Sequence, residues 1–261
     1  MPDGAASLDV LTWGDGPRRI LLLHGISSSA AGWWRLAGDL AERDWSVVAP
    51  DLRGHGSSPA GDDYRFAAHA DDVLALGTGW DVVLGHSLGG AVAVVAATAE
   101  PEWTGGLILQ DPGLMLVDRA RDEVTEWLLD AYREPATAEA VAERNPRWHP
   151  EDCRIKAEAL RSSSSEVVAA TLRDNDPWML LTDAAEVPVP MVVLGSDPDC
   201  GAIVPVTIGE WLADRPGVEY RMLAGAGHSA HREDDTYDRY LHEMLGALDR
   251  LPELAMERRR L

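Results

Sequence analysis

A serine lies in the segment whose residue types and spacing are best suited to chemistry. Residues 85–90 read GHSLGG and follow an apolar run, residues 80–84, that is typical of a buried strand. The small apolar residues 91–99 that come next predict a helix. Gly85 and Gly89 permit a turn too tight for a Cβ atom. Strand, sharp turn and helix would hold the Ser87 hydroxyl at the apex as a nucleophile, and a plain Gly-Ser loop is the alternative.

Composition and charge narrow the class of protein. The chain has 261 residues, 46% of them hydrophobic, and a net charge of −21. A chain this acidic is repelled by nucleic acids and anionic membranes, so we expect neither as a partner. The two cysteines, Cys153 and Cys200, match no metal-binding spacing and imply no disulfide framework. With no signal peptide or membrane span visible, we expect a cytoplasmic protein.

Short apolar runs alternate with helical segments over the first 111 residues. The runs are predicted strands at 20–23, 46–49, 80–84 and 106–110, and two more follow at 189–195 and 218–223. Helices are predicted between them, for example near 31–43 and 64–76. This alternation predicts an α/β fold with a doubly wound, mostly parallel sheet.

The pattern changes between residues 112 and 187, where helical periodicity and prolines predict helices and no strand. We therefore expect a core in two parts, 1–111 and 188–261, interrupted by a helical cap at 112–187. Large apolar side chains of the cap either line a substrate pocket or pack the cap onto the core. The candidates for the pocket are Trp127, Trp148, Trp178, Met115 and Met179.

Four motifs in order resemble the α/β-hydrolase superfamily along nearly the whole chain. They are His24-Gly25 after a strand, DLRGHGSS at 51–58, GHSLGG at 85–90 and GAGH at 225–228. The resemblance implies the α/β-hydrolase fold and makes residues 85–90 its nucleophile elbow, with Ser87 as the nucleophile.

A serine hydroxyl needs a general base, because it is a weak nucleophile when neutral. The resemblance implies His228, which follows the last strand and a glycine-rich turn. His231 is the nearest rival, three residues further on. His86 flanks the serine, and its side chain is expected to point away from the tip of the turn. The other histidines are assigned to structural turns, helices or the surface: His24, His55, His69, His149 and His242.

The acid of the triad is open between three aspartates. In most of the family it follows the strand after the cap, which here favours Asp199 and then Asp197. A minority carries it after the strand beside the nucleophile strand, where this chain has Asp111. An aspartate at a buried strand end needs a partner to offset its desolvation, and His228 is the obvious one. We favour Asp111, with Asp199 and then Asp197 as alternatives; each aspartate could instead cap a turn or helix.

The oxyanion hole is expected to consist of two backbone N–H groups. The resemblance implies those of Leu88, directly after the nucleophile, and Ile26, after His24-Gly25.

These assignments predict a serine hydrolase acting on a carboxylic ester or lactone of an apolar or aromatic small molecule. The expected reaction proceeds through an acyl-enzyme on Ser87 and uses no metal or organic cofactor. The same triad could instead cleave a carbon–carbon bond, transfer an acyl group or hydrolyse an amide. A member that only binds a ligand is the alternative outside the enzymes. The oligomeric state is left open.

Overall fold

A single mixed sheet of seven strands forms the centre of the computed structural model, which describes residues 5–116, 118–133 and 135–259. The strand order is β1-β3-β2-β4-β5-β8-β9, with β1 antiparallel to β3 and the other neighbours parallel. The strands are β1 (Val10–Trp13), β2 (Arg18–Leu23), β3 (Trp45–Pro50), β4 (Val82–His86), β5 (Leu107–Gln110), β8 (Met191–Ser196) and β9 (Val218–Leu223). The predicted fold class is confirmed.

The central strands contain unbroken apolar runs because helices cover both faces of the sheet. In β2, Leu21 and Leu23 face one hydrophobic cluster, while Ile20 and Leu22 face the other. Alternate residues of a strand point to opposite faces, so a strand buried on both sides needs an unbroken apolar run. The edge strand β9 is only partly buried, and its sequence alternates polar and apolar residues.

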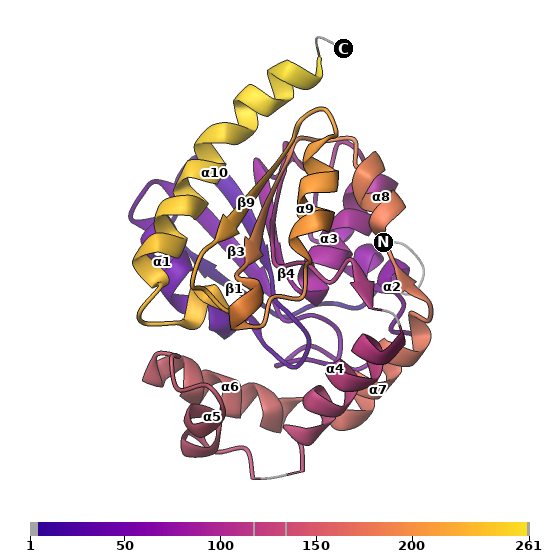
Figure 1. The fold of residues 1–261 in the computed structure, drawn as a ribbon, viewed down its shortest axis with the longest axis vertical. Helices are drawn as coiled ribbons and strands as arrows, with labels where there is room; N and C mark the ends of the chain where they lie inside the picture. The colour runs from indigo at the N-terminus through magenta and orange to yellow at the C-terminus, as the bar shows by residue number, and fades with distance from the viewer. Residues whose placement is uncertain (1–4, 117, 134, 260–261) are drawn as a thin grey trace.

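Helices cover both faces of the sheet (Figure 1). The first face carries α1 (Trp34–Ala41) and α10 (Tyr237–Arg258). The second carries α2 (Phe66–Leu74), α3 (Leu88–Ala99), α8 (Leu181–Glu186) and α9 (Val206–Ala213). Helix α10 continues through Pro252 to Arg258.

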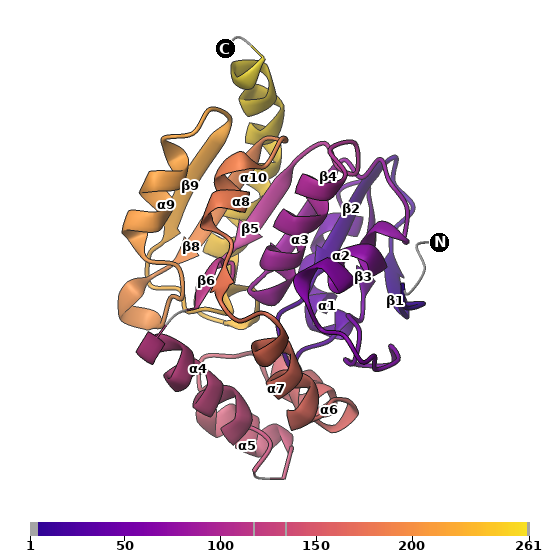
Figure 2. The same ribbon diagram turned by 90° about the vertical axis from the view of Figure 1, so that its right-hand side faces the viewer.

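The chain between β5 and β8 forms the remaining helices, which lie beyond the carboxyl ends of the strands (Figures 1 and 2). They are α4 (Asp118–Asp130), α5 (Ala138–Arg144), α6 (Pro150–Ser162) and α7 (Ser165–Asp174). Helix α7 is anchored to the core by Val168 and Leu172. Among the described residues, no helix is both long and apolar enough to cross a lipid bilayer.

The prediction that this segment contains no strand is wrong. Two short strands, β6 (Met115–Leu116) and β7 (Trp178–Met179), pair antiparallel and tie together the two ends of the segment. Each strand has only two residues, too few for alternation of polar and apolar residues to mark it in the sequence.

Candidate active site

Ser87 occupies a strained turn between β4 and α3. Its backbone angles are φ 53° and ψ −116°, a conformation that non-glycine residues rarely adopt. A Cβ atom on Gly85 would lie 2.4 Å from the Gly89 carbonyl oxygen, and one on Gly89 would lie 2.2 Å from the Leu23 carbonyl oxygen. The two glycines therefore let the helix begin directly against the neighbouring strands, which leaves Ser87 at the apex.

His228 and Asp111 form a short hydrogen bond. The distance from His228 Nδ1 to Asp111 Oδ2 is 2.7 Å. Asp111 is fully buried and also accepts the backbone N–H groups of Ile203 (3.0 Å) and Val204 (3.1 Å). The ionised carboxylate only accepts hydrogen bonds, so His228 donates from Nδ1, and in the neutral ring Nε2 is left as the proton acceptor.

The sheet brings Ser87 and Asp111 to the same edge. β4 and β5 are adjacent and parallel, and their last residues, His86 and Gln110, are paired in register. The next residue of each strand is Ser87 or Asp111, so both follow at the carboxyl ends of neighbouring strands. Ligands of open α/β sheets bind at this edge.

His228 reaches the same place from β9, two strands beyond β5. The loop after β9 is tied to the end of β8 by Ser196, whose hydroxyl donates to the Gly227 carbonyl (2.9 Å). His86 holds the next carbonyl, because its Nε2 lies 2.9 Å from the His228 oxygen. The His86 ring thus lies beside His228, with 4.6 Å between the ring centroids, and positions the backbone of the candidate base.

The two rival aspartates are placed differently. Asp197 caps the turn after β8, accepting the N–H groups of Asp199 (2.9 Å) and Gly225 (2.7 Å). These backbone hydrogen bonds lower the pKa of Asp197, because they favour the ionised form. Asp199 is exposed. Of the three candidates, Asp111 is the one whose carboxylate meets His228 within the described part of the chain.

His231, the rival base, is buried and occupied at both ring nitrogens. Arg232 Nε donates to His231 Nε2 (3.1 Å), so in the neutral ring the proton resides on Nδ1. The side-chain nitrogen of Gln110 lies 2.9 Å from that Nδ1, and the Gln110 oxygen has no partner within the described chain; turning the amide over would place the oxygen where it accepts from Nδ1. Burial lowers the pKa of His231 well below its usual value, which suits this neutral, fixed ring.

The turn that carries Ile26 is held by two neutral histidines. His24 Nε2 accepts the Leu52 N–H (3.0 Å), and His55 Nε2 accepts the Ser27 N–H (3.1 Å). Burial lowers the pKa of His24 to about 4 and that of His55 to about 3, so both rings stay neutral and can accept. A Cβ atom on Gly25 would lie 3.1 Å from the Ser87 Cβ, so this turn lies directly beside the serine.

The two predicted oxyanion donors come from different segments of the chain, one before β3 and one directly after Ser87. Leu88 is the first residue of α3, and the N–H groups of a first helical turn have no partner within the helix. Ile26 lies in the turn after β2, between Gly25 and Ser27. Ser27 has a left-handed backbone (φ 54°) that the His55 hydrogen bond helps to hold.

The predicted pocket residues are dispersed. Trp178 is buried, lies edge-on to Phe66 at 4.7 Å between ring centroids, and donates its indole N–H to the Gly113 carbonyl (2.6 Å). Trp127 is 62% exposed on α4. Met115 and Met179 pair across the β6–β7 ribbon. Trp148 lies under the Arg232 guanidinium, 4.9 Å from the ring centroid. The contacts of Trp178 and the exposure of Trp127 fit packing and surface positions.

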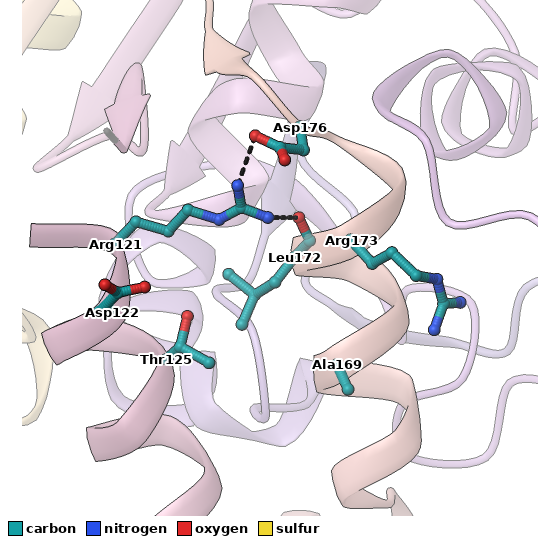
Figure 3. Close-up of a pocket in the computed structure, with 7 residues that line it drawn as sticks. All are labelled: Arg121, Asp122, Thr125, Ala169, Leu172, Arg173 and Asp176. Carbon is teal, nitrogen blue, oxygen red and sulfur yellow. Dashed lines mark hydrogen bonds and ion pairs between the residues drawn. The ribbon is translucent and has the colours of Figure 1, made fainter. Parts of the chain in front are cut away.

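A hollow of about 280 Å³ lies between α4 and α7, and none of the predicted pocket residues lines it (Figure 3). It is lined by Arg121, Asp122, Thr125, Ala169, Leu172, Arg173 and Asp176. Arg121 crosses it to form an ion pair with Asp176 and donates to the Leu172 carbonyl (3.0 Å). The hollow contains none of the predicted catalytic residues. Across the described ranges, no group of three or more His, Cys, Asp or Glu side chains is placed to hold a metal ion.

Three residues of the site were not singled out by the sequence analysis. Lys156 on α6 donates to the carbonyl and hydroxyl of Ser27, and Arg232 is buried beside His231. The side-chain nitrogen of Gln110 lies 2.9 Å from His231 Nδ1. The sequence offered one hint of these residues, which is that Lys156 is its single lysine.

The sheet order, the strained serine turn and the Asp111–His228 pair together define a class of protein. The model of the alpha/beta hydrolase family matches residues 20–241. The chain therefore belongs to the alpha/beta hydrolase family, as the motifs predicted.

Individual relatives support a hydrolase. Lipase LipV of Mycobacterium tuberculosis is 40% identical over 131 residues, which are 48% of this chain and 49% of the lipase. This chain spans about half of that lipase's length and 30% to 37% of several other curated relatives. N-formylmaleamate deformylase of Pseudomonas putida is 26% identical over 86% of this chain and 87% of its own.

A solved structure of a Pseudomonas putida N-formylmaleamic acid deformylase is similar over most of its length. Its TM-score is 0.72 at 26% identity, covering 89% of this chain and 94% of the deformylase.

Proposed function

We propose that this protein is a serine hydrolase that cleaves a carboxylic ester or lactone of a small molecule through an acyl-enzyme on Ser87. The observation that carries the proposal is the 2.7 Å hydrogen bond between His228 Nδ1 and the buried Asp111 carboxylate, at the sheet edge where Ser87 lies in its strained turn. A ligand-binding protein has no need of an oriented base and a buried acid at the sheet edge that carries a partly exposed serine.

The proposed mechanism assigns each group one task. Ser87 Oγ attacks the acyl carbon while His228 Nε2 takes its proton, and the Asp111 carboxylate stabilises the imidazolium. The N–H groups of Ile26 and Leu88 bind the oxyanion, each contributing about 3 kcal/mol to the transition state. His228 then protonates the leaving alkoxide, and a water molecule repeats the sequence to release the acid and restore Ser87.

In this proposal, residues 112–187 act as a cap that selects the substrate. Helices α4 to α7 of this segment lie beyond the carboxyl ends of the strands (Figure 1), and Ser87 and Asp111 directly follow the carboxyl ends of β4 and β5. Contacts from α6 reach the turn beside the serine, because Lys156 Nζ lies 2.6 Å from the Ser27 carbonyl oxygen. The apolar side chains Met115 and Trp148 are the remaining candidates to contact an apolar or aromatic substrate, since both are partly buried.

Amide hydrolysis is the second candidate function. The deformylase of Pseudomonas putida aligns along 86% of this chain, more than the lipase does. The same triad cleaves an amide when His228 protonates the leaving nitrogen, so only the leaving group differs.

Labelling with a fluorophosphonate tests the proposal. The activated Ser87 oxygen displaces fluoride from phosphorus, and intact-mass spectrometry should find one adduct on the parent and none on Ser87→Ala. Ser57→Ala, at an exposed serine, is the control and should label like the parent. The parent should also release 4-nitrophenol from simple aryl esters. A folded parent that neither labels nor turns over such esters would exclude a serine hydrolase and favour a binding protein.

A further inference from the structure

Lys156 is the single lysine among 23 basic residues, and its ammonium group is turned towards the core from α6. Its Nζ donates to the Ser27 carbonyl oxygen (2.6 Å) and to the Ser27 hydroxyl (2.7 Å). Both acceptors are neutral, and an ammonium group has three N–H donors. One donor is left over, and the charge has no carboxylate in contact with it among the residues that the structure describes.

A second cation, which is buried, acts on the partly buried Lys156. The Arg232 guanidinium donates to the Ser28 hydroxyl (2.5 Å) and to His231 Nε2 (3.1 Å), again to neutral acceptors. Burial and the charge of Arg232 lower the pKa of Lys156 to about 7. Two cations that repel each other are costly where they are partly or fully shielded from water, unless an anion offsets them.

The one carboxylate within the group offsets only part of the charge of the two cations. Asp152 is buried on α6 and accepts the indole N–H of Trp34 (3.3 Å), while its other oxygen has no hydrogen-bond partner within the described chain. Burial raises the pKa of Asp152 to about 6, although Arg232 opposes the shift. The cluster of Lys156, Arg232 and Asp152 therefore carries excess positive charge, in a chain whose net charge is −21.

The excess charge lies next to the candidate reaction centre. Ser27, which Lys156 holds, is the residue directly after Ile26, the candidate oxyanion donor. One residue earlier, the Gly25 backbone approaches the Ser87 side chain closely enough that an added Cβ would lie 3.1 Å from Ser87 Cβ. A substrate whose carbonyl is bound by the Ile26 N–H would have its acyl part within reach of this charge.

We propose that Lys156, supported by Arg232, binds a carboxylate on the acyl part of the substrate, so that the preferred substrates are esters, lactones or amides of small dicarboxylic acids. This inference rests on the proposed function of Ser87. A bound carboxylate would accept the third N–H of Lys156 and balance the two cations. A purely structural role would need only the two hydrogen bonds to Ser27, which leave the third N–H of Lys156 free to bind a ligand.

A matched pair of aryl esters tests the inference. 4-Nitrophenyl hydrogen adipate carries a free carboxylate, and 4-nitrophenyl methyl adipate has the same chain without the charge. The parent should show a higher kcat/KM for the anionic ester, after subtraction of spontaneous hydrolysis. In Lys156→Met the ratio of anionic to neutral kcat/KM should fall about 10- to 100-fold, the usual effect of losing a hydrogen bond to a charged group. Lys156→Arg should keep most of the preference.

Arg154→Met is the control on the same helix. Arg154 is exposed and pairs with Glu151 (2.6 Å), so the substitution makes the same change in net charge away from the Ser27 turn. Its ratio of kcat/KM should equal that of the parent within about twofold. An unchanged ratio in Lys156→Met, or equal losses on both esters, would overturn the inference and leave Lys156 as a structural clamp.

A second measurement separates this inference from the proposed function. Acylation of the single lysine by an activated ester can be followed by peptide mass spectrometry, with the α-amino group as an internal reference. In Ser87→Ala, which cannot form an acyl-enzyme, monomethyl adipate should slow the modification of Lys156 and leave the reference unchanged. Absence of protection would contradict the carboxylate site even if the parent proves to be an esterase, and protection would support it even if no ester is cleaved.

Discussion

Replacing Asp111 by asparagine removes the charge that orients His228 and changes little else in volume. Asp111 Oδ2 receives two donors, His228 Nδ1–H (2.7 Å) and the Ile203 N–H (3.0 Å), and Oδ1 receives the Val204 N–H (3.1 Å). An asparagine has one oxygen and one NH₂ group, so it cannot accept all three. One of its two orientations must be chosen, and each carries a cost.

If the asparagine NH₂ takes the Oδ2 position, it meets His228 Nδ1 with a donor. The ring then keeps its proton on Nε2, where it cannot take the proton of Ser87. If the NH₂ takes the Oδ1 position, the buried Val204 N–H loses its acceptor, at a cost of about 1 to 3 kcal/mol in the free energy of unfolding. In both cases the imidazolium loses its counter-charge, so we expect a fall in kcat of about 10⁴-fold, as in other Ser-His-Asp enzymes.

The assay is the rate of fluorophosphonate labelling, followed by intact mass at pH 7.5, together with urea unfolding to show that the variant is folded. Asp199→Asn is the matched control, because Asp199 is exposed and has no described contact with His228, and it should label within about threefold of the parent. A folded Asp111→Asn variant that labels within tenfold of the parent would refute the assignment. So would a collapse of labelling in Asp199→Asn.

Two further predictions concern stability, measured by urea unfolding. Gly89→Ala should lower the free energy of unfolding by about 3 kcal/mol or more, because the new Cβ would lie 2.2 Å from the Leu23 backbone oxygen. Gly38→Ala is the control: its Cβ would meet nothing within 4 Å, so this change should raise the free energy of unfolding by up to about 1 kcal/mol. Equal effects of the two substitutions would contradict the packing argument. His69→Leu should make the free energy of unfolding less sensitive to acid. Burial lowers the pKa of His69 well below 6.5, so below pH 6.5 the unfolded chain binds a proton that the folded chain does not. In the parent, the free energy of unfolding therefore falls with acidification by up to about 1.4 kcal/mol per pH unit from this residue. Parallel losses from pH 7.5 to pH 5 in parent and variant would show that His69 does not titrate in this way.

The fold and the serine turn were predictable because their signals are local. A buried parallel strand needs an apolar run, and the turn at Ser87 needs small residues within a few positions of the serine. Both requirements are satisfied inside ten residues, so no knowledge of distant contacts is required. The two-residue strands β6 and β7 lie below the length at which such a pattern exists, and they were missed for that reason.

Partners far apart in the sequence were decided only in three dimensions. Asp111 and His228 are 117 positions apart, and the contact depends on the loop after β9 returning across two strands. Asp111 directly follows β5 and Asp197 directly follows β8, so both lie at the carboxyl edge of the sheet. The two aspartates differ in the backbone N–H groups that each carboxylate accepts. Asp197 accepts those of its own turn, while Asp111 accepts those of Ile203 and Val204 and keeps one oxygen towards the histidine.

The sequence alone thus determined the sheet, the serine at its edge and the histidine that follows the last strand, because each depends on the residues next to it. The tertiary structure decided which carboxylate meets that histidine and that the lone lysine turns its charge towards the turn beside the serine. Both contacts depend on how deeply a side chain is buried and where it points, and these are set by segments that come together only when the chain folds.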